Sequence, residues 1–182
     1  LTSTSQISIQ AMKVDAVGNI IVAGIIQGES DADPTLNAYL LQATNPEFFL
    51  AKYDSSGTLL WAGELNNVGS AANYQHTFIS GIEVDVFGDI TITGAMDPPI
   101  DFDPSAANAT VLIQGTYQAF VAKYTSAGTY VNAFRISGTG ARCEGSGITS
   151  DATGNIFVAG AFAGTVDLNP GAGTNNVTAT ST

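Results

Sequence analysis

One internal repeat dominates this sequence and restricts the folds that it can adopt. A stretch with the pattern Asp-x-x-Gly-Asn/Asp-Ile that ends in a glycine occurs three times, at residues 14–24, 84–94 and 150–160. A second stretch, Phe-x-Ala-Lys-Tyr-x-Ser-x-Gly-Thr, occurs twice, at 49–58 and 120–129. Because the two stretches alternate along the chain, the sequence holds two and a half copies of one repeating unit.

Each stretch predicts a β-hairpin. After the first turn, Ile20 and Val22 share one face of an extended strand, and the other copies also have Ile or Val at these two positions. Asp accepts hydrogen bonds from nearby backbone amides, and Gly adopts a positive φ at no steric cost, so Asp-x-x-Gly favours a tight turn. The residues expected to shape these turns are Asp15, Gly18, Asp85, Gly88, Asp151, Gly154, Gly57 and Gly128. The less favoured interpretation of the three repeated acids, Asp15, Asp85 and Asp151, is a shared metal or ligand site.

Two hairpins in each unit predict four strands in each unit, and no segment shows a convincing helical period. Residues 36–43 are the one stretch compatible with a short helical turn, but Pro34 and Pro46 bracket it. Repeated four-stranded antiparallel sheets predict an all-β chain of β-propeller-type blades. A β-sandwich is the alternative, but it does not explain a four-strand repeat. We expect one blade-like repeat at 1–80, a second at 81–146, and the first half of a third, incomplete repeat at 147–182.

A third recurring motif, Asp-x-Asp/Asn-Pro, follows each first hairpin. It occurs at residues 31–34, 101–104 and 167–170. Calcium takes six to eight oxygen ligands from carboxylates and carbonyls, so these loops are candidate calcium sites. The candidate ligands are Asp31, Asp33, Asp97, Asp101, Asp103, Asp167 and Asn169. The favoured alternative is that Asp and Pro shape a recurring turn, since no loop has the full EF-hand pattern.

These three motifs in this order resemble the bacterial β-propeller repeat family abbreviated SBBP. The resemblance extends over nearly the whole chain, and it is specific as a combination rather than motif by motif. It implies a fold of propeller blades and a place in large secreted or surface proteins, often adhesin-like. It implies no catalytic residues.

The number of repeats raises the question of closure. Closed propellers have about 4–8 blades, so two and a half repeats leave blade faces and a sheet edge open. One expectation is that the chain is part of a longer propeller. A second is that copies of the chain complete one another by strand addition in an oligomer or filament, and a third is an irregular open structure. The expected partners are therefore copies of the chain or the remainder of a longer protein.

Composition excludes several classes of function. With 16 acidic and 5 basic residues the net charge is -11, which disfavours nucleic-acid binding because phosphates require a basic surface. The sequence has no stretch of about 18 uncharged apolar residues, so it predicts no membrane-spanning helix. The single cysteine excludes an internal disulfide and a multi-cysteine zinc site. Few lysines and abundant small polar residues favour a secreted or cell-surface protein, with a cytoplasmic one as the alternative.

Isolated side chains give weaker signals. Lys52 and Lys123 occupy equivalent positions, where we expect half-exposed lysines paired with acids rather than an anion site. His76 is the only histidine, and Cys143 is expected to be an unpaired surface or edge thiol, with Arg142 beside it able to lower its pKa. A sugar-stacking surface would use aromatic side chains, but none forms a recurring set; the candidates are Trp61, whose repeat counterpart is Asn132, Tyr39, Tyr74, Tyr117 and Tyr130.

We therefore expect no enzyme. The predicted function is a structural or adhesive module of an exported bacterial surface protein or extracellular filament, acting through strand edges and loops. The alternative is a propeller that binds surface glycans or proteins. A hydrolase that uses loop carboxylates is the weakest alternative. No cofactor is predicted apart from the candidate calcium.

Overall fold

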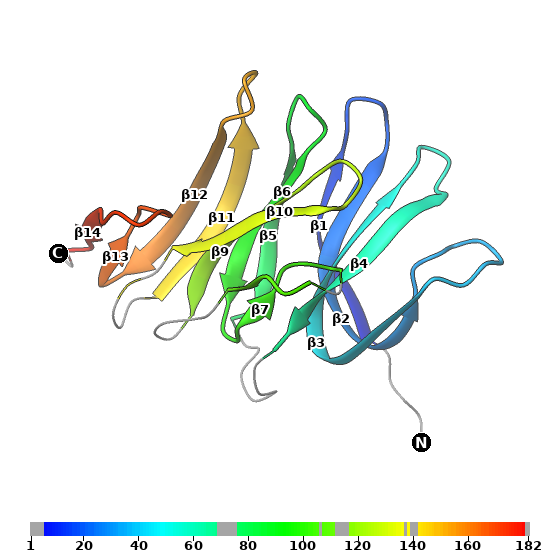
Figure 1. Ribbon diagram of the computed structural model, residues 1–182, viewed down its shortest axis with the longest axis horizontal. Helices are drawn as coiled ribbons and strands as arrows, with labels where there is room; N and C mark the ends of the chain where they lie inside the picture. Colours follow the sequence, from blue (N-terminus) through cyan, green and yellow to red (C-terminus); the bar gives the residue numbers. More distant parts are fainter. Residues whose placement is uncertain are drawn as a thin grey trace.

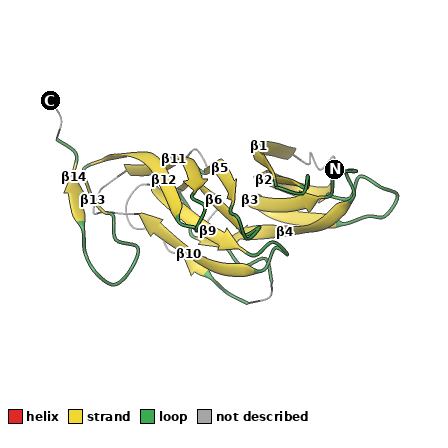
Figure 2. Cartoon of the chain, turned by 90° about the horizontal axis from the view of Figure 1, so that it is seen from above, coloured by secondary structure: helices red, strands yellow, loops and turns green. Residues whose placement is uncertain are grey.

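The computed structural model describes residues 6–68, 76–105, 107–111, 117–136, 138 and 142–180. All regular elements in these ranges are β-strands, and no described residue is helical (Figures 1 and 2). The strands are β1 (Gln6–Val14), β2 (Ile20–Asp31), β3 (Leu40–Tyr53), β4 (Leu59–Asn67), β5 (Phe78–Val84), β6 (Ile90–Met96), β7 (Ile100–Asp101), β8 (Thr110–Val111), β9 (Gln118–Tyr124), β10 (Tyr130–Ile136), β11 (Arg142–Ser150), β12 (Ile156–Ala163), β13 (Thr165–Asp167) and β14 (Asn176–Thr178).

The strands form repeated antiparallel sheets, as the sequence predicts. Blade 1 consists of β1-β2-β3-β4, and the short strands β7 and β8 extend its outer edge. Blade 2 is the four-stranded sheet β10-β9-β6-β5. The third unit contains the hairpins β11-β12 and β13-β14. The three units follow one another along the long axis of the molecule (Figure 1). The all-β fold of propeller-type blades is therefore confirmed.

The unit boundaries lie elsewhere than expected. The expected boundaries at 80/81 and 146/147 fall inside strands, because β5 begins at Phe78 and β11 begins at Arg142. The recognisable repeat begins only near the end of the first strand of each unit. The sequences before that point differ, so the repeat pattern does not indicate where the first strand of a unit begins.

The hairpin turns share one backbone geometry. In the first, the amide of Asp15 donates to the carbonyl of Asn19 at 2.9 Å, and the amide of Gly18 donates to the carbonyl of Asp15 at 3.1 Å. The same two bonds recur at 54–58, 85–89, 125–129 and 151–155. The glycine of each of these turns has a φ between 81° and 91°, a region that side chains rarely adopt. This requirement explains why the turn glycine recurs in every copy.

The last position of the first motif requires glycine for a different reason. Gly24, Gly94 and Gly160 each lie opposite a β-bulge in the first strand of their unit. A Cβ atom at any of the three would collide with a backbone carbonyl of that strand. The close backbone approach at the bulge therefore fixes glycine at the end of each copy.

The long hairpin of β2 and β3 corrects one expectation. Residues 40–43 form no helical turn; they are the start of β3 and pair with residues 28–31 of β2. Pro46 lies in β3 where the register is irregular, and there its missing amide breaks no regular ladder bond. Leu41 and Ala43 pack against the outward side of blade 1 in a cluster with Phe49. We call residues 28–43 the arm.

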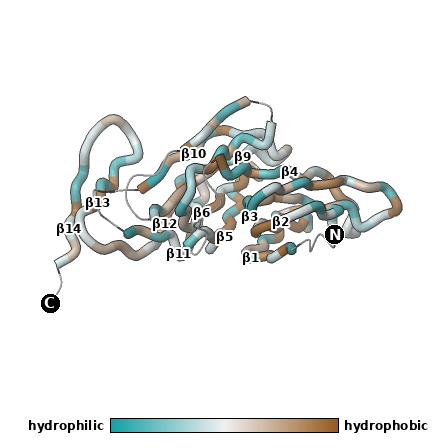
Figure 3. The backbone as a smooth tube through the Cα atoms, turned by 90° about the horizontal axis from the view of Figure 1, so that it is seen from below, coloured by the Kyte–Doolittle hydropathy of each residue, from teal (hydrophilic) through white to brown (hydrophobic). Residues whose placement is uncertain are grey.

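The main hydrophobic core lies between blade 1 and blade 2. Phe120 of β9 is fully buried, with its ring centroid 5.4 Å from Phe48 of blade 1 and 5.0 Å from Phe102. Strand residues from both blades complete this core, namely Ile21, Ala23, Leu50, Leu65, Ile79, Ile82, Ile90, Ile92, Met96, Ile100, Ala122 and Tyr124. Hydrophobic segments of the backbone gather in the strands of these two blades (Figure 3). We call this contact the closed interface. No helix able to cross a membrane occurs in the described residues.

Candidate functional site

The acids of the first-hairpin turns each bind their own turn. Asp15 accepts hydrogen bonds through Oδ1 from the amides of Val17 and Asn19, at 3.1 and 2.8 Å. The equivalent bonds recur at Asp85 and at Asp151. Burial opposes ionisation of Asp15, but hydrogen bonds from Asn19 and Lys52 outweigh it and lower its pKa to about 2. The three acids thus serve three separate turns.

Two of these acids also pair with the repeated lysines. Lys52 Nζ lies 3.0 Å from Asp15 Oδ2, and both side chains are at most 7% exposed. Lys123 Nζ lies 3.1 Å from Asp85 Oδ2 and from Asp89 Oδ2, with 24% of its side chain exposed. Burial lowers the pKa of Lys123, but the bonds to the two acids raise it overall. The expected half-exposed state is therefore wrong for Lys52, because the closed interface covers it.

The three Asp-x-Asp/Asn-Pro loops are nearly identical in their hydrogen bonds. The first acid of each accepts two amides, one two residues ahead and one eight residues ahead, at 2.8–3.1 Å. The second residue, Asp33, Asp103 or Asn169, accepts the amide two residues further on, at 2.8 or 2.9 Å. These side chains thus replace backbone partners within the loop, which is the chemistry of recurring turns.

The loops offer little to a calcium ion. One oxygen of each side chain is already engaged by amides, and no three His, Cys, Asp or Glu side chains within the described ranges gather as metal ligands. Asp97 makes hydrogen bonds that differ from those of the loop acids. Its Oδ2 accepts the amide of His76 at 3.1 Å, and its own amide donates to Thr77. The arrangement present does not fit the calcium coordination that the sequence suggested.

The loop of the second copy connects neighbouring blades, whereas the equivalent hydrogen bond of the first copy lies within blade 1. In the second copy, Phe102 is fully buried in the closed interface, and its carbonyl accepts the hydroxyl of Tyr124 at 2.9 Å. In the first copy, the hydroxyl of Tyr53 donates in the same way to Ala32. In the third copy the counterpart, Leu168, is 40% exposed. The loop is therefore a packing element whose burial depends on the blade beside it.

A cluster that does not repeat surrounds His76. The His76 ring stacks on Tyr117, with centroids 4.4 Å apart, and Nδ1 lies 3.3 Å from Asp97 Oδ2. The Arg142 guanidinium lies 4.9 Å from the centre of the Tyr117 ring. Cys143 is a free cysteine, as expected, but it is only 5% exposed, so the expected surface position is wrong. Burial raises the pKa of its thiol, which is the opposite of the effect that Arg142 could have had. Sequence separation concealed this cluster, because its members lie on four segments that are distant in the sequence.

The aromatic side chains are engaged in packing. Trp61 Nε1 donates to the carbonyl of Ser126 at 3.2 Å, and Gly128 lies against its ring. The hydroxyl of Tyr39 donates to the carbonyl of Ala62. Tyr130 packs edge-on against Tyr124. Tyr74 lies outside the described residues. The aromatic candidates that are described thus have contacts within the chain in place of a shared stacking surface.

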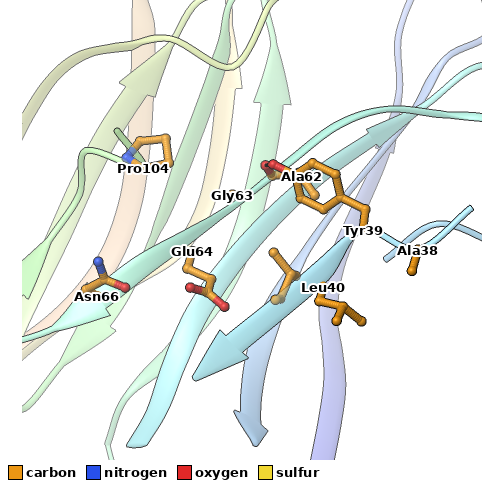
Figure 4. Close-up of a pocket in the computed structure, with 9 residues that line it drawn as sticks. Ala38, Tyr39, Leu40, Ala62, Gly63, Glu64, Asn66 and Pro104 are labelled. Atoms are coloured by element: carbon orange, nitrogen blue, oxygen red, sulfur yellow. Dashed lines mark hydrogen bonds between the residues drawn. The ribbon is translucent and has the colours of Figure 1, made fainter. Parts of the chain in front are cut away.

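Several hollows accompany the loops in the described part of the chain. The first, of about 340 Å³, lies between the arm, β4 and Pro104 of the second Asp-x-Asp-Pro loop (Figure 4). Glu64 lines it, and its carboxylate accepts the amide of Gln42 in the arm. Nearby, burial and the charge of Glu64 raise the pKa of Glu47 to about 7. Sequence reasoning missed these two glutamates, which occur in no repeated motif.

The second hollow, of about 390 Å³, lies between blade 2 and the third unit, and we call it the open groove. Blade 2 contributes a cross-strand row of three polar residues, Thr91, Lys123 and Asn132. The equivalent row of blade 1, Ile21, Lys52 and Trp61, lies in the closed interface. The remaining lining is mostly apolar and comes from Val121, Phe134, Ile136, Gly154, Ile156, Val158, Leu168 and Pro170.

A last surface feature is an apolar stripe on β1. Its four large side chains are 50–64% exposed: Ile7, Ile9, Met12 and Val14. The repeat counterparts of Ile9 and Met12 in blade 2 are Ile79 and Ile82, which are only 2% and 6% exposed because they pack in the closed interface. We call these four residues the β1 stripe.

The comparisons with known proteins agree with this architecture. No protein-family model matches the sequence. An uncharacterized WD repeat-containing protein of Acanthamoeba polyphaga mimivirus is 30% identical, over 69% of this chain. The chain spans only about 10% of the length of that protein. The β-sheets and this likeness together identify the chain as a series of propeller-type blades.

Proposed function

We propose that the chain is a non-enzymatic interaction module, structural or adhesive, in an exported protein of the bacterial surface or an extracellular filament. It acts through blade faces, strand edges and loops. The observation that carries the proposal is the β1 stripe. In blade 2 the equivalent residues Ile79 and Ile82 are buried against blade 1, whereas in blade 1 the stripe is exposed to solvent.

The energetics support association at this stripe. A contiguous exposed patch of large apolar residues on a soluble domain marks an interaction surface. Full burial of one such side chain is worth roughly 1.5–3 kcal/mol before the costs of association are subtracted. The arm covers the outward side of β3, but the stripe on β1 lies beyond that cover.

The exported location is supported by composition and by the resemblance to SBBP repeats. Only 5 residues are Lys or Arg, and the net charge is -11, which keeps such a module soluble and disfavours nucleic acid as a partner. The expected partners are further copies of the chain, other blades, or surface proteins and glycans.

Replacement of two stripe residues tests the proposal. We expect the parent chain to associate as its concentration rises, and Ile9→Lys with Met12→Lys to restore a mass near 18.6 kDa. Light scattering across a concentration series measures this. Val17→Lys with Val86→Lys is the matched control, because both residues are exposed turn residues outside the stripe. A parent chain that stays monomeric at every concentration would rule out association through its own stripe.

A further inference from the structure

A trough along β4 takes its shape from residues outside the repeat pattern. The hollow between the arm and β4 adjoins a third hollow, of about 270 Å³, and both are lined by Ala62, Gly63 and Pro104. We call these two hollows together the β4 trough. We propose that the β4 trough binds lysine or arginine side chains from an extended basic segment of a partner protein.

The β4 trough lies where blade 1 meets blade 2. The third hollow is enclosed by β4 at Trp61 and Gly63, by the loop that contains Pro104, and by residues 127–130 around the β9–β10 turn. Both blades have their four strands. The trough is therefore a feature of two complete blades.

The shape of the trough depends on departures from the repeat. Three lining residues of β4 differ in character from their counterparts in β10: Trp61 corresponds to Asn132, Gly63 to Phe134, and Glu64 to Arg135. A Cβ atom at Gly63 would lie only 2.6 Å from Cβ of Pro104, so glycine lets the loop approach β4 this closely. The hairpin pattern does not account for these three differences.

Each hollow contains one carboxylate. Glu64 lines the hollow beside the arm, Asp103 lines the third hollow, and no described Lys, Arg or His lines either. The amide of Gln42 donates to Glu64 Oε1, and the amide of Ser105 donates to Asp103 Oδ1 at 2.9 Å. These amides engage only one oxygen of each carboxylate, which leaves the other to meet a cation.

Neighbouring groups respond to this negative charge. Burial raises the pKa of Tyr130, and the charges of Asp103 and Asp101 also raise it, against a lowering hydrogen bond with Ala133. The charge of Glu64 adds in the same way to the effect of burial on the pKa of Glu47. A cation in the trough would offset this charge, and the net charge of -11 favours the approach of a basic partner.

Aromatic rings line the same hollows. Tyr39, which is 43% exposed, lies in the hollow with Glu64 (Figure 4), and Trp61 and Tyr130 line the hollow with Asp103. Hydrogen bonds to backbone carbonyls hold the Tyr39 hydroxyl and Trp61 Nε1 in place. Cations are attracted to the rings of Tyr and Trp. A carboxylate beside aromatic rings in each hollow suits a basic side chain, whereas a neutral sugar would leave the charge unpaired.

This inference rests on the proposed function, since it names one partner of an interaction module. It concerns the β4 trough, whereas the proposed function is carried by the β1 stripe. Self-association through the stripe and binding of a basic segment at the trough are measured separately, and either can fail alone.

A titration with a basic peptide tests the proposal. The probe is the capped peptide Ser-Lys-Ser-Lys-Ser-Lys-Ser, followed by NMR of the backbone amides of the full chain. We expect shifts in β4 and in residues 127–130, and weaker binding as the salt concentration rises. The same peptide with Gln in place of each Lys should cause no shifts.

Two charge-neutral variants locate the site. Glu64→Gln with Asp103→Asn keeps an acceptor oxygen at both positions, and Asn169 already makes the equivalent loop bond in the third copy. We expect this variant to bind the lysine peptide at least about tenfold more weakly. Glu29→Gln with Asp33→Asn is the matched control, because it removes two acidic charges outside the trough, and its affinity should stay within about twofold of the parent.

Three results would overturn the proposal. The first is no shift in β4 and 127–130 with the lysine peptide, and the second is an equal effect of the lysine and glutamine peptides. The third is equal weakening by the two double variants, which would indicate a general attraction to an acidic chain. A titration with the neutral trisaccharide chitotriose separates the glycan alternative. Shifts of the same amides with chitotriose, but not with the lysine peptide, would assign the trough to a sugar instead.

Discussion

The two contacts between successive units use equivalent positions but differ in completeness. In the closed interface, four strands of each blade contribute, Lys52 is enclosed, and the Asp-x-Asp-Pro loop buries Phe102. At the open groove, a two-stranded hairpin faces a four-stranded blade, Lys123 is 24% exposed, and Leu168 is 40% exposed. Equivalent residues of the repeat are thus buried or exposed according to which strands lie opposite them.

The largest difference is expected for aromatic residues on the two faces. Phe120→Ala removes a fully buried ring that contacts Phe48 and Phe102, so we expect the free energy of unfolding to fall by about 3–5 kcal/mol. Phe134→Ala, in the open groove, removes a partly buried ring and should cost about 1 kcal/mol. Urea denaturation measures both. Equal losses would show that the groove is packed as tightly as the closed interface.

The repeated lysines give the next largest difference. Lys52→Met leaves the Asp15 carboxylate enclosed without its cation, and should cost about 3 kcal/mol of stability. Lys123→Met should cost about 1 kcal/mol, because water reaches this partly exposed pair. The two variants are compared by denaturation at pH 7. A greater loss at Lys123 would contradict the view that cover by a neighbouring hairpin decides the strength of the pair.

Local motifs were predictable from the sequence because their physics is local. The turn at Asp15 and Gly18 needs only its own amides and a positive φ. The strand at Leu40 was not predictable, since it depends on pairing with the arm's other strand. Burial of Lys52 and Cys143, and the stacking of His76 on Tyr117, depend on contacts between distant segments. A repeat predicts its own hairpins, but not the neighbour that covers them.

Glu47, on the outward side of blade 1, should make the stability of the chain depend on pH. Burial, together with the charge of Glu64, raises the pKa of Glu47 from 4.5 to about 7, so between these values the folded chain holds a proton that the unfolded chain has lost. This contribution to stability is therefore fully present below pH 4.5 and is lost as the pH rises through 7. Glu47→Gln should raise stability above pH 7 by at most about 3 kcal/mol.

Thermal unfolding from pH 4 to pH 9 measures this effect. Glu29→Gln, at an exposed residue of the arm, is the matched control and should leave the pH profile unchanged. A parallel profile for the Glu47→Gln variant and the parent chain would show that Glu47 is hydrated in solution.

The smallest effects are expected at the Asp-x-Asp/Asn-Pro loops. Asp101→Ala removes the acceptor for the amides of Asp103 and Ala109 in the loop that carries the buried Phe102, and should cost about 1–2 kcal/mol. Asp167→Ala removes the same bonds in an exposed loop and should cost less.

Because amides already engage these acids, EDTA should leave the melting temperature of the parent chain unchanged. If EDTA lowers it, and Asp101→Ala with Asp103→Ala removes that sensitivity, then the loops bind calcium despite their turn geometry. In that case, cover by the neighbouring blade would not be the only factor that orders the loops.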